Sequence, residues 1–289
     1  MKRGWLPIML GWAVLAGVAA PEPKAALFEE SRTTTPETPL DSFVFRRLEK
    51  AGIRPSYCTD AVFLRRAYLD VIGTLPTADE ARAFFNDDSL NKRGALVDRL
   101  LEREEFADLW AMRWSDLLRV KAEFPVNLWP NAAQAYHRWI RTSIRDNKPY
   151  DRFARELLTS NGSNFRVGPV NFYRAMQDRS PEGIAAAVAL TFMGVRADSW
   201  PSNTLAGMAV FFSQLSYKPT REWKEEIVFW NPDAGSAAPT GGVAAAAATG
   251  KRLYGVLPDK TRLRLPQDRD PRDVFADWLI TPDNPWFTQ

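Results

Sequence analysis

Residues 60–80 of the chain, DAVFLRRAYLDVIGTLPTADE, decide the fold class because they contain one complete helix and the start of the next. Apolar residues recur every three or four positions, which places their side chains on one face of an α-helix. These residues are Phe63, Leu64, Ala67, Tyr68 and Val71. Gly73 follows, and glycine is typical of the residue just beyond a helix end. Thr77 and Glu80 then have the spacing of a capping box, so a second helix is expected to begin there.

The same apolar spacing continues on both sides of this stretch, from Pro39 to about Leu215. Asp41 is expected to cap a helix that ends at Gly52 and carries Leu40, Val44 and Leu48 on one face. Further helices are predicted near residues 78–85, 97–101, 106–118, 136–144, 153–158, 185–193 and 205–215. Residues 185–193 are apolar almost throughout, which indicates a buried helix.

The pattern changes after Tyr217. Residues 226–230 are typical of a strand, and residues 252–256 and 261–265 flank a turn sequence that predicts a β-hairpin. Residues 241–250 are rich in glycine and alanine and are expected to form a loop, and a last helix is predicted at 271–280. The sequence therefore predicts a mainly α fold, a multi-helix domain with a small β-containing segment near the C-terminus.

The first twenty residues have the pattern of a secretory signal peptide. Met1-Lys2-Arg3 is positively charged, Ile8 to Ala20 is apolar, and Gly17-Val18-Ala19 offers a small-residue cleavage site. The alternative is an uncleaved N-terminal anchor. No later apolar stretch is long enough to span a bilayer. We therefore expect an exported protein of the periplasm or cell envelope, in which residues 21–38 form a linker.

The chain contains one histidine, His137, and one cysteine, Cys58, which excludes several classes of site. A disulfide within the chain needs two cysteines, and a Cys/His zinc site needs three or four such ligands. Covalent c-type haem attachment needs a Cys-x-x-Cys-His run, which is absent, so we expect no cofactor and no metal. The net charge of +3 is spread among 35 acidic residues and gives no nucleic-acid footprint.

The densest charged clusters lie on two of the predicted helices. Arg65 and Arg66 precede Asp70 on the first of these helices, whereas Arg113 and Arg119 flank Asp116 on the second. One interpretation is that the four arginines form structural ion pairs with the acids. The other is that Asp70 and Asp116 are catalytic and converge in a cleft, as the two acids of a glycoside hydrolase do. Eleven tryptophans either build a sugar-binding platform or fill gaps between helices.

Several strings of residues occur in the order found in one known family. They are residues 41–48 (DSFVFRRL), 64–77 (LRRAYLDVIGTLPT), 96–101 (LVDRLL), 114–119 (WSDLLR) and 147–153 (NKPYDRF). Over roughly residues 40–230 the chain resembles the domain-of-unknown-function family 1549, common in large exported proteins of planctomycetes and verrucomicrobia. Residues 270–285 resemble the start of its partner domain, family 1553, which implies that residues 270–289 are the beginning of a truncated second domain.

The resemblance implies a helical domain at 39–230, followed by a linker and β-hairpin at 231–269. Many members carry a Cys-x-x-Cys-His run and are called cytochrome-like, but this chain has Ala197-Asp198-Ser199-Trp200-Pro201 at that point. Covalent haem is therefore not expected. The leading hypothesis is a scaffold or accessory component of an envelope complex, with another envelope protein as partner. The alternative is a carboxylate-based hydrolase, or a carbohydrate-binding component, of polysaccharide degradation.

Overall fold

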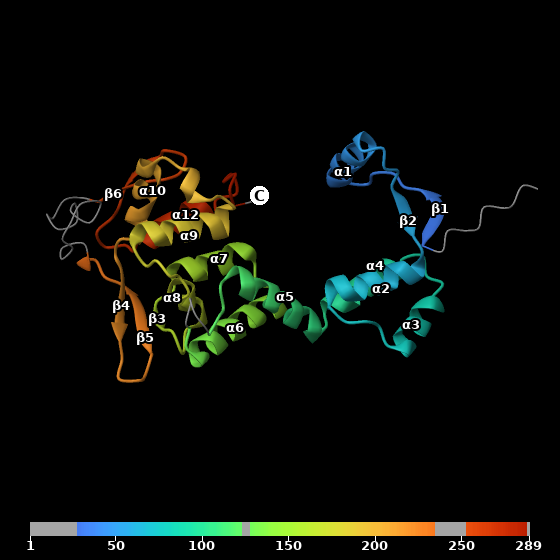
Figure 1. Ribbon diagram of the computed structural model, residues 1–289, viewed down its shortest axis with the longest axis horizontal. Coiled ribbons are helices and arrows are strands. Elements are labelled where there is room, and N and C mark those ends of the chain that lie inside the picture. The colour runs from blue at the N-terminus through green and yellow to red at the C-terminus, as the bar shows by residue number, and fades with distance from the viewer. Residues whose placement is uncertain (1–27, 123–127, 235–252, 288–289) are drawn as a thin grey trace, which may run out of the picture. The chain divides into compact units, whose positions relative to one another are not determined.

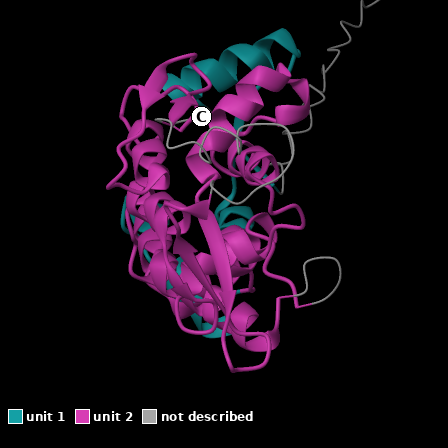
Figure 2. Ribbon diagram, turned by 90° about the vertical axis from the view of Figure 1, so that its left-hand side faces the viewer, with its two compact units in different colours: residues 1–67, 76–93 teal, residues 68–75, 94–289 magenta. Residues whose placement is uncertain are grey.

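A computed structural model describes residues 28–122, 128–234 and 253–287 of the chain (Figure 1). The predicted signal peptide at 1–20 and the loop at 241–250 lie outside these ranges. Two compact units make up the chain, one formed by residues 1–67 and 76–93 and the other by residues 68–75 and 94–289 (Figure 2). The family-like region predicted at 39–230 thus contributes to both units.

Unit 1 combines a two-stranded sheet with helices. Strand β1 (Glu29–Thr33) pairs antiparallel with β2 (Ser56–Cys58), and α1 (Pro39–Lys50) connects them. The remaining elements are the first part of α2 (Asp60–Val71), α3 (Ala78–Phe85) and the start of α4 (Lys92–Leu101). Strand β1 lies within the predicted linker 21–38, and Cys58 lies in a strand although a loop was predicted. Neither strand has an alternating apolar pattern in its sequence. Each is stabilised by backbone hydrogen bonds to a segment distant in the chain, and such bonds leave no local signal in the sequence.

The start of α1 differs from the sequence prediction by one turn. Thr38 is the N-cap, and Asp41 is the third helical residue of a capping box. The Asp41 backbone N–H donates to Thr38 Oγ1 at 3.1 Å, and the Thr38 N–H donates to Asp41 Oδ2 at 2.9 Å. The prediction that Asp41 is the cap is therefore wrong, because Pro39 already begins the helix. The predicted end is confirmed, since Gly52 adopts a left-handed φ of 70°.

A charged cluster holds the strand pair of unit 1 to its helices. Arg93 donates to Asp60 and Glu30 at 2.8 Å each and to the Cys58 carbonyl at 2.9 Å. Lys92 lies 2.7 Å from the other oxygen of Asp60. Burial alone would raise the pKa of Asp60, but the hydrogen bonds from Lys92 and Arg93 outweigh it, so this pKa lies below its ordinary value.

Unit 2 contains most of the helices and a three-stranded sheet. Besides the end of α2 and most of α4, its described helices are α5 (Glu104–Leu117), α6 (Pro130–Arg145), α7 (Tyr150–Thr159), α8 (Asn171–Arg174), α9 (Pro181–Met193), α10 (Ser202–Ala209) and α12 (Pro271–Leu279). Short 3₁₀ turns are η1 (Gly168–Val170), η2 (Ala197–Ser199) and η3 (Val210–Phe212). The sheet has the antiparallel order β3 (Gly162–Ser163), β5 (Glu226–Trp230), β4 (Leu215–Pro219). A separate hairpin joins β6 (Tyr254–Val256) to β7 (Arg262–Arg264). The fold is mainly α, as predicted.

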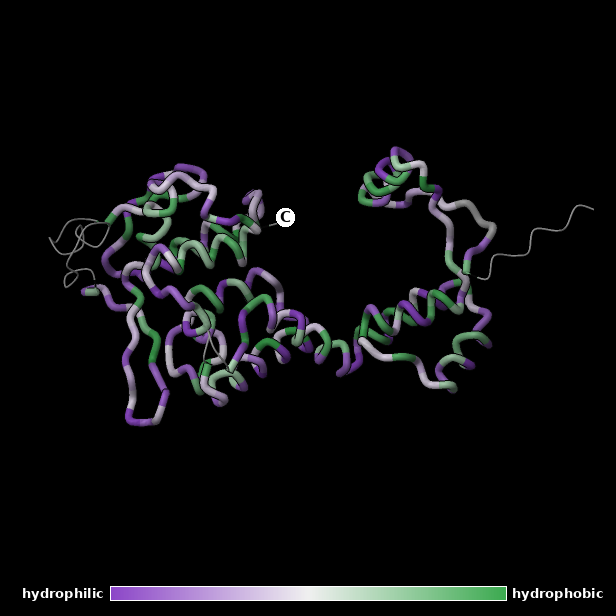
Figure 3. Tube along the Cα trace, in the orientation of Figure 1, coloured by the Kyte–Doolittle hydropathy of each residue, from purple (hydrophilic) through white to green (hydrophobic). Residues whose placement is uncertain are grey.

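The core of unit 2 forms around α9. Ser180 caps this helix by accepting from the Gly183 N–H, Pro181 begins it, and Gly194 ends it with a left-handed φ of 64°. Its side chains Ile184, Ala185, Val188, Ala189, Phe192 and Met193 are buried, which confirms the prediction of a buried helix. Figure 3 shows hydrophobic residues along α9 and also along α1, although α1 buries none of its residues.

The last predicted helix before the sheet is shorter than expected. The apolar spacing at 205–215 predicted one helix, but α10 ends at Ala209 and η3 follows. Leu215 begins β4 and pairs with Trp230 of β5. Helical spacing is broken here because sheet pairing satisfies the backbone of Leu215–Pro219 instead. Strand β5, the hairpin and α12 lie where the sequence placed them. Among the described residues, no helix is both long and apolar enough to cross a bilayer.

Candidate functional site

The two candidate carboxylates lie in the last turns of different helices. Asp70 is exposed on α2 and Asp116 is exposed on α5. The nearby indole of Trp110 donates to the Val71 carbonyl at 3.3 Å. Asp116 lies six residues beyond Trp110, about 9 Å further along α5. Within the part of the chain that the structure describes, no hydrogen bond or ion pair joins the two carboxylates, so the structure does not bring them together.

The four candidate arginines do not form the expected ion pairs. Arg65 and Arg66 are exposed on α2, and Arg113 is exposed on α5, where its guanidinium lies 4.8 Å from the Trp110 ring. In the described ranges, none of the three is within salt-bridge distance of a carboxylate. Arg66 and Asp70 are both exposed, and no ion pair joins them in the described structure.

Arg119 has a different environment from the other three. It follows α5 with a left-handed φ of 60°. Its Nη1 atom is buried without a hydrogen-bond partner among the described residues, as are the Tyr136 hydroxyl and Ser115 Oγ. Burial raises the pKa of Tyr136, and the positive charge of Arg119 opposes that rise. Among the described residues the Arg119 guanidinium thus lies near the Tyr136 phenol and pairs with no carboxylate, while the Arg119 backbone N–H donates to the Asp116 carbonyl at 3.3 Å.

The tryptophans near the candidate carboxylates are part of the aromatic packing of unit 2. Trp139 stacks on Phe153 with ring centroids 4.6 Å apart, and the Lys148 ammonium lies 5.0 Å from its ring. Trp139 also donates to Glu156 at 2.9 Å. Trp114 lies 5.2 Å from the Phe153 ring. These contacts cover ring surface that a sugar platform would need to leave open.

The structure contains a buried ion pair that the sequence did not indicate. Arg272, at the start of α12, has a side chain only 2% exposed and bonds Asp270 through Nη2 at 2.7 Å. It also donates to the Ser160 carbonyl at 3.1 Å and to Asn161 Oδ1 at 2.6 Å. Residues 268–273, DRDPRD, look like an exposed charged segment in the sequence. The burial of Arg272 depends on Ser160 and Asn161, which are more than a hundred positions away, so the local sequence does not indicate it.

A second charged cluster lies between α8 and the sheet. Arg174 is 2.7 Å from Glu226 on β5, and Arg179 is 3.6 Å from the same carboxylate. Burial and the neighbouring Arg179 lower the pKa of Arg174. The Arg179 guanidinium also lies 5.1 Å from the ring of Tyr217 on β4. This cluster joins a helix to the sheet, and the sequence did not indicate it.

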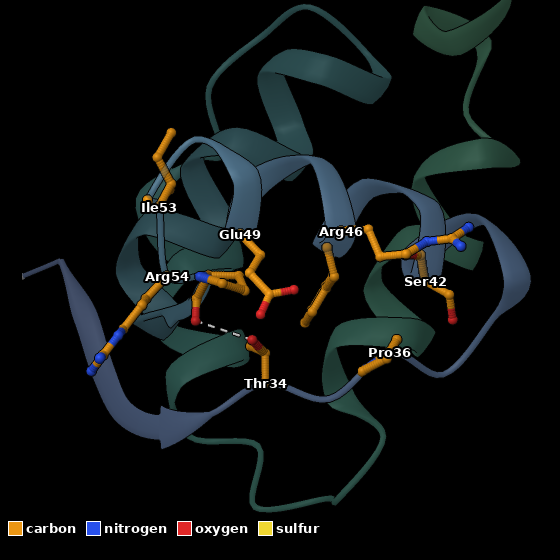
Figure 4. Close-up of a pocket in the computed structure, with 10 residues that line it drawn as sticks. Thr34, Pro36, Ser42, Arg46, Glu49, Ile53 and Arg54 are labelled. Atoms are coloured by element: carbon orange, nitrogen blue, oxygen red, sulfur yellow. Dashed lines mark hydrogen bonds between the residues drawn. The ribbon is translucent and has the colours of Figure 1, made fainter.

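Unit 1 contains an open groove of about 910 Å³ (Figure 4). Its lining comes from the end of β1, from α1 and from the connection to β2: Thr34, Pro36, Ser42, Phe45, Arg46, Glu49, Gly52, Ile53, Arg54 and Pro55. The Thr34 hydroxyl donates to the Pro55 carbonyl at 3.1 Å, and both residues line the groove. Figure 4 shows the Glu49 carboxylate and the Thr34 hydroxyl pointing toward each other.

A second, smaller hollow adjoins this groove along α1. It has a volume of about 490 Å³ and is lined by Phe43, Arg46, Arg47 and Lys50, so Arg46 borders both. Leu40, Phe43 and Val44 of the same helix are 71%, 58% and 43% exposed. The sequence predicted the apolar face of this helix but not that unit 1 would leave it uncovered.

The one cysteine and the one histidine of the chain lie on different elements, Cys58 on β2 and His137 on α6. The segment Ala197-Asp198-Ser199 forms the short turn η2. The only histidine, His137, is half-buried on α6. The described ranges contain no group of three or more His, Cys, Asp or Glu side chains placed to hold a metal ion.

Comparison with known proteins identifies one family. The sequence model of PSCyt2, described as a protein of unknown function (DUF1549), matches residues 39–199, which is more than half of the chain. This range begins where the quoted motifs begin and ends short of the predicted limit at 230. The resemblance of residues 270–285 to family 1553 stays a prediction. No curated protein and no solved structure matches the chain. The match over the motif-bearing region shows that the chain belongs to the PSCyt2 (DUF1549) family.

Proposed function

We propose that this protein is a non-catalytic accessory component of an exported envelope complex and that α1 of unit 1 supplies its binding surface. The observation that carries the proposal is that α1 is amphipathic and well capped but buries none of its residues. A helix with an apolar face normally gains its stability by burying that face. The uncovered face of α1 therefore favours a partner.

The size of the uncovered surface supports this function. Leu40, Phe43 and Val44 lie within about one turn of one another on α1, and Phe43 borders the hollow of about 490 Å³. Contiguous apolar patches on a folded protein are typical of interaction sites, whereas single exposed apolar residues are common and carry no meaning. Burial of one such side chain in an interface contributes roughly 1.5–3 kcal/mol.

Export is part of the proposal because of the N-terminal sequence. The charged start Met1-Lys2-Arg3 and the apolar run to Ala20 support secretion. The alternative function, a carboxylate-based hydrolase or carbohydrate-binding component, has less support. Asp70 and Asp116 are exposed on separate helices, and the rings of Trp114 and Trp139 are engaged in packing.

The test is the native size of the protein in cells that naturally produce it. The tagged chain is extracted gently and separated by native electrophoresis and by size exclusion. We expect the wild-type chain to migrate as part of an assembly much larger than one copy, and Phe43→Ser to migrate as a single chain. Leu90→Ser is the matched control, since Leu90 is fully exposed in unit 1 but lies outside α1. A wild-type chain that runs as a single copy would contradict the proposal.

A further inference from the structure

We propose that α1 binds an acidic segment of a partner protein that inserts an apolar side chain beside Phe43. This inference rests on the proposed function and adds the chemistry of the partner. Phe43, Arg47 and Lys50 lie at successive helical spacings of four and three residues, so they form one stripe along α1. The stripe begins with an apolar anchor position and continues with cations.

The charges along α1 are unevenly placed. The acidic residue of the first turn, Asp41, is occupied by the capping box with Thr38. The second half of the helix presents Arg46, Arg47 and Lys50, all exposed and all at the rim of the hollow of about 490 Å³. Glu49, the acid in this half of the helix, lines the larger groove and not this hollow. Arg46 donates its Nε to the Ser42 carbonyl, 3.2 Å away. Within the described residues, none of the three cations has a carboxylate within salt-bridge distance.

The side chains around the hollow determine which kind of partner segment can bind there. Three cations without acidic partners attract carboxylates and repel basic segments, which sets specificity as well as the rate of association. Phe43 forms the apolar part of the hollow, and an aromatic side chain at the centre of a contact is typical of an energetic anchor. An acidic segment with one or more apolar side chains satisfies both requirements.

The shape of the surface favours a protein segment over a lipid bilayer. Arg46 borders both the hollow and the larger groove, so α1 has recessed surface on either side of this side chain. A recess of this kind accepts side chains that project from a peptide. A helix that lies on a membrane would instead insert a continuous apolar face, and in α1 the cations Arg46 and Arg47 directly follow that face.

The experiment measures binding of labelled synthetic peptides to the full chain by fluorescence anisotropy. One set of peptides, about 14 residues long, has Leu or Phe at every third or fourth position and Asp or Glu between them. The matched set has Lys in place of every acid. We expect the acidic peptides to bind, the basic ones not to bind, and added salt to weaken binding.

Variants of α1 make the test specific. Phe43→Ser is expected to weaken binding of the acidic peptides at least tenfold. The double variant Arg46→Glu, Arg47→Glu is expected to lose them and to gain binding of the basic set. Leu90→Ser and Arg82→Glu are controls, because both side chains are exposed in unit 1 away from α1. Circular dichroism verifies that each variant is folded.

Two results would overturn the inference. One is equal binding of acidic and basic peptides, or binding that the α1 variants leave unchanged. The other is binding to vesicles of phosphatidylglycerol and phosphatidylcholine that depends on Phe43 while no peptide binds. If Phe43→Ser releases the chain from its native assembly but acidic peptides do not bind, only the partner chemistry is wrong. If acidic peptides bind but the native chain is a single copy, the envelope complex is contradicted and the peptide surface stands.

Discussion

Arg272 shows how one side chain links distant parts of unit 2. Its guanidinium bonds Asp270 next to it, the Ser160 carbonyl and Asn161 Oδ1 after α7, and lies 5.4 Å from the Tyr173 ring. A buried charge is tolerated only when its donors are satisfied. Arg272 therefore fixes the start of α12 against the segment that follows α7 and against α8, which carries Tyr173.

Removal of the Arg272 side chain is expected to destabilise unit 2. Arg272→Ala leaves the Asp270 carboxylate buried without its partner, which should lower the free energy of unfolding of unit 2 by about 3–5 kcal/mol. Denaturant unfolding followed by tryptophan fluorescence measures the change. The matched control is Arg269→Ala, whose side chain is 45% exposed and pairs with Asp277, so a cost of about 0–1 kcal/mol is expected. Equal costs for the two variants would contradict this account.

The buried tyrosines predict how stability changes in alkali. Burial raises the pKa of Tyr217 to about 12, although Arg179 and Arg174 oppose the rise, and burial also raises the pKa values of Tyr136 and Tyr173. The folded state therefore holds these protons more tightly than the unfolded state does. Their contribution is fully present below about pH 10, the ordinary tyrosine pKa, and is lost as the pH rises toward 12.

The measurement is a spectrophotometric titration of the phenolate band, with unfolding followed by circular dichroism in parallel. We expect the exposed tyrosines to ionise first, while the chain is folded, and a later phase to coincide with unfolding. Tyr217→Phe should reduce the absorbance change of the late phase by the contribution of one phenol. Ionisation of all seven tyrosines near pH 10 in a chain that stays folded would show that the burial assignment is wrong.

At the scale of elements, α1 and α3 contrast within the same unit. Both begin with a capping box, formed by Thr38 and Asp41 in one and by Thr77 and Glu80 in the other. Phe84 of α3 is 2% exposed and stacks 6.2 Å from Phe63 of α2. Caps thus define both helices, but only α3 is anchored in the interior of unit 1.

This contrast predicts that two phenylalanine substitutions lower the free energy of unfolding by different amounts. Phe84→Ala is expected to lower the free energy of unfolding by about 3–5 kcal/mol, because it removes a buried ring and leaves a cavity. Phe43→Ser is expected to change it by less than about 0.5 kcal/mol, because the ring is already in contact with solvent. Thermal and denaturant unfolding of the two variants compare the costs. A large cost for Phe43→Ser would mean that α1 is packed and would remove the basis of the proposed binding surface.

At the scale of the whole molecule, the division into two units has a consequence for stability. Each unit has its own stabilising contacts, namely the Asp60–Arg93 cluster in unit 1 and the large apolar core around α9 in unit 2. A chain with more than one cooperative unit need not unfold in a single transition. Local stability should then respond to substitutions unit by unit.

Arg93→Ala tests this independence. Loss of the bonds to Asp60, Glu30 and the Cys58 carbonyl should lower the stability of unit 1 by about 1–3 kcal/mol. Hydrogen exchange read by mass spectrometry is expected to accelerate in β1, β2 and α3 and to stay unchanged in α9 and α12. Arg145→Ala serves as control, since its pair with Asp146 is exposed. Equal acceleration throughout the chain would mean that the two units unfold together.

Much of the secondary structure could be predicted from sequence because its signals are local. The capping box of Thr77 and Glu80, the glycine after α9 and the apolar run of β5 each occupy a few neighbouring residues. The site was far less predictable. The proposed pairing of Arg66 with Asp70 rested on spacing alone, and spacing does not show whether a helix face is buried.

The sequence by itself determined the helical class, the position of α9, the strand β5 and the membership of the family, because these depend on contiguous motifs. Only the tertiary structure decided that Arg272 is buried, that β1 pairs with β2, and that unit 1 leaves Leu40, Phe43 and Val44 of α1 exposed. The physical reason is that burial depends on which residues from remote parts of the chain come to lie against a side chain, and that packing is settled only when the whole unit folds.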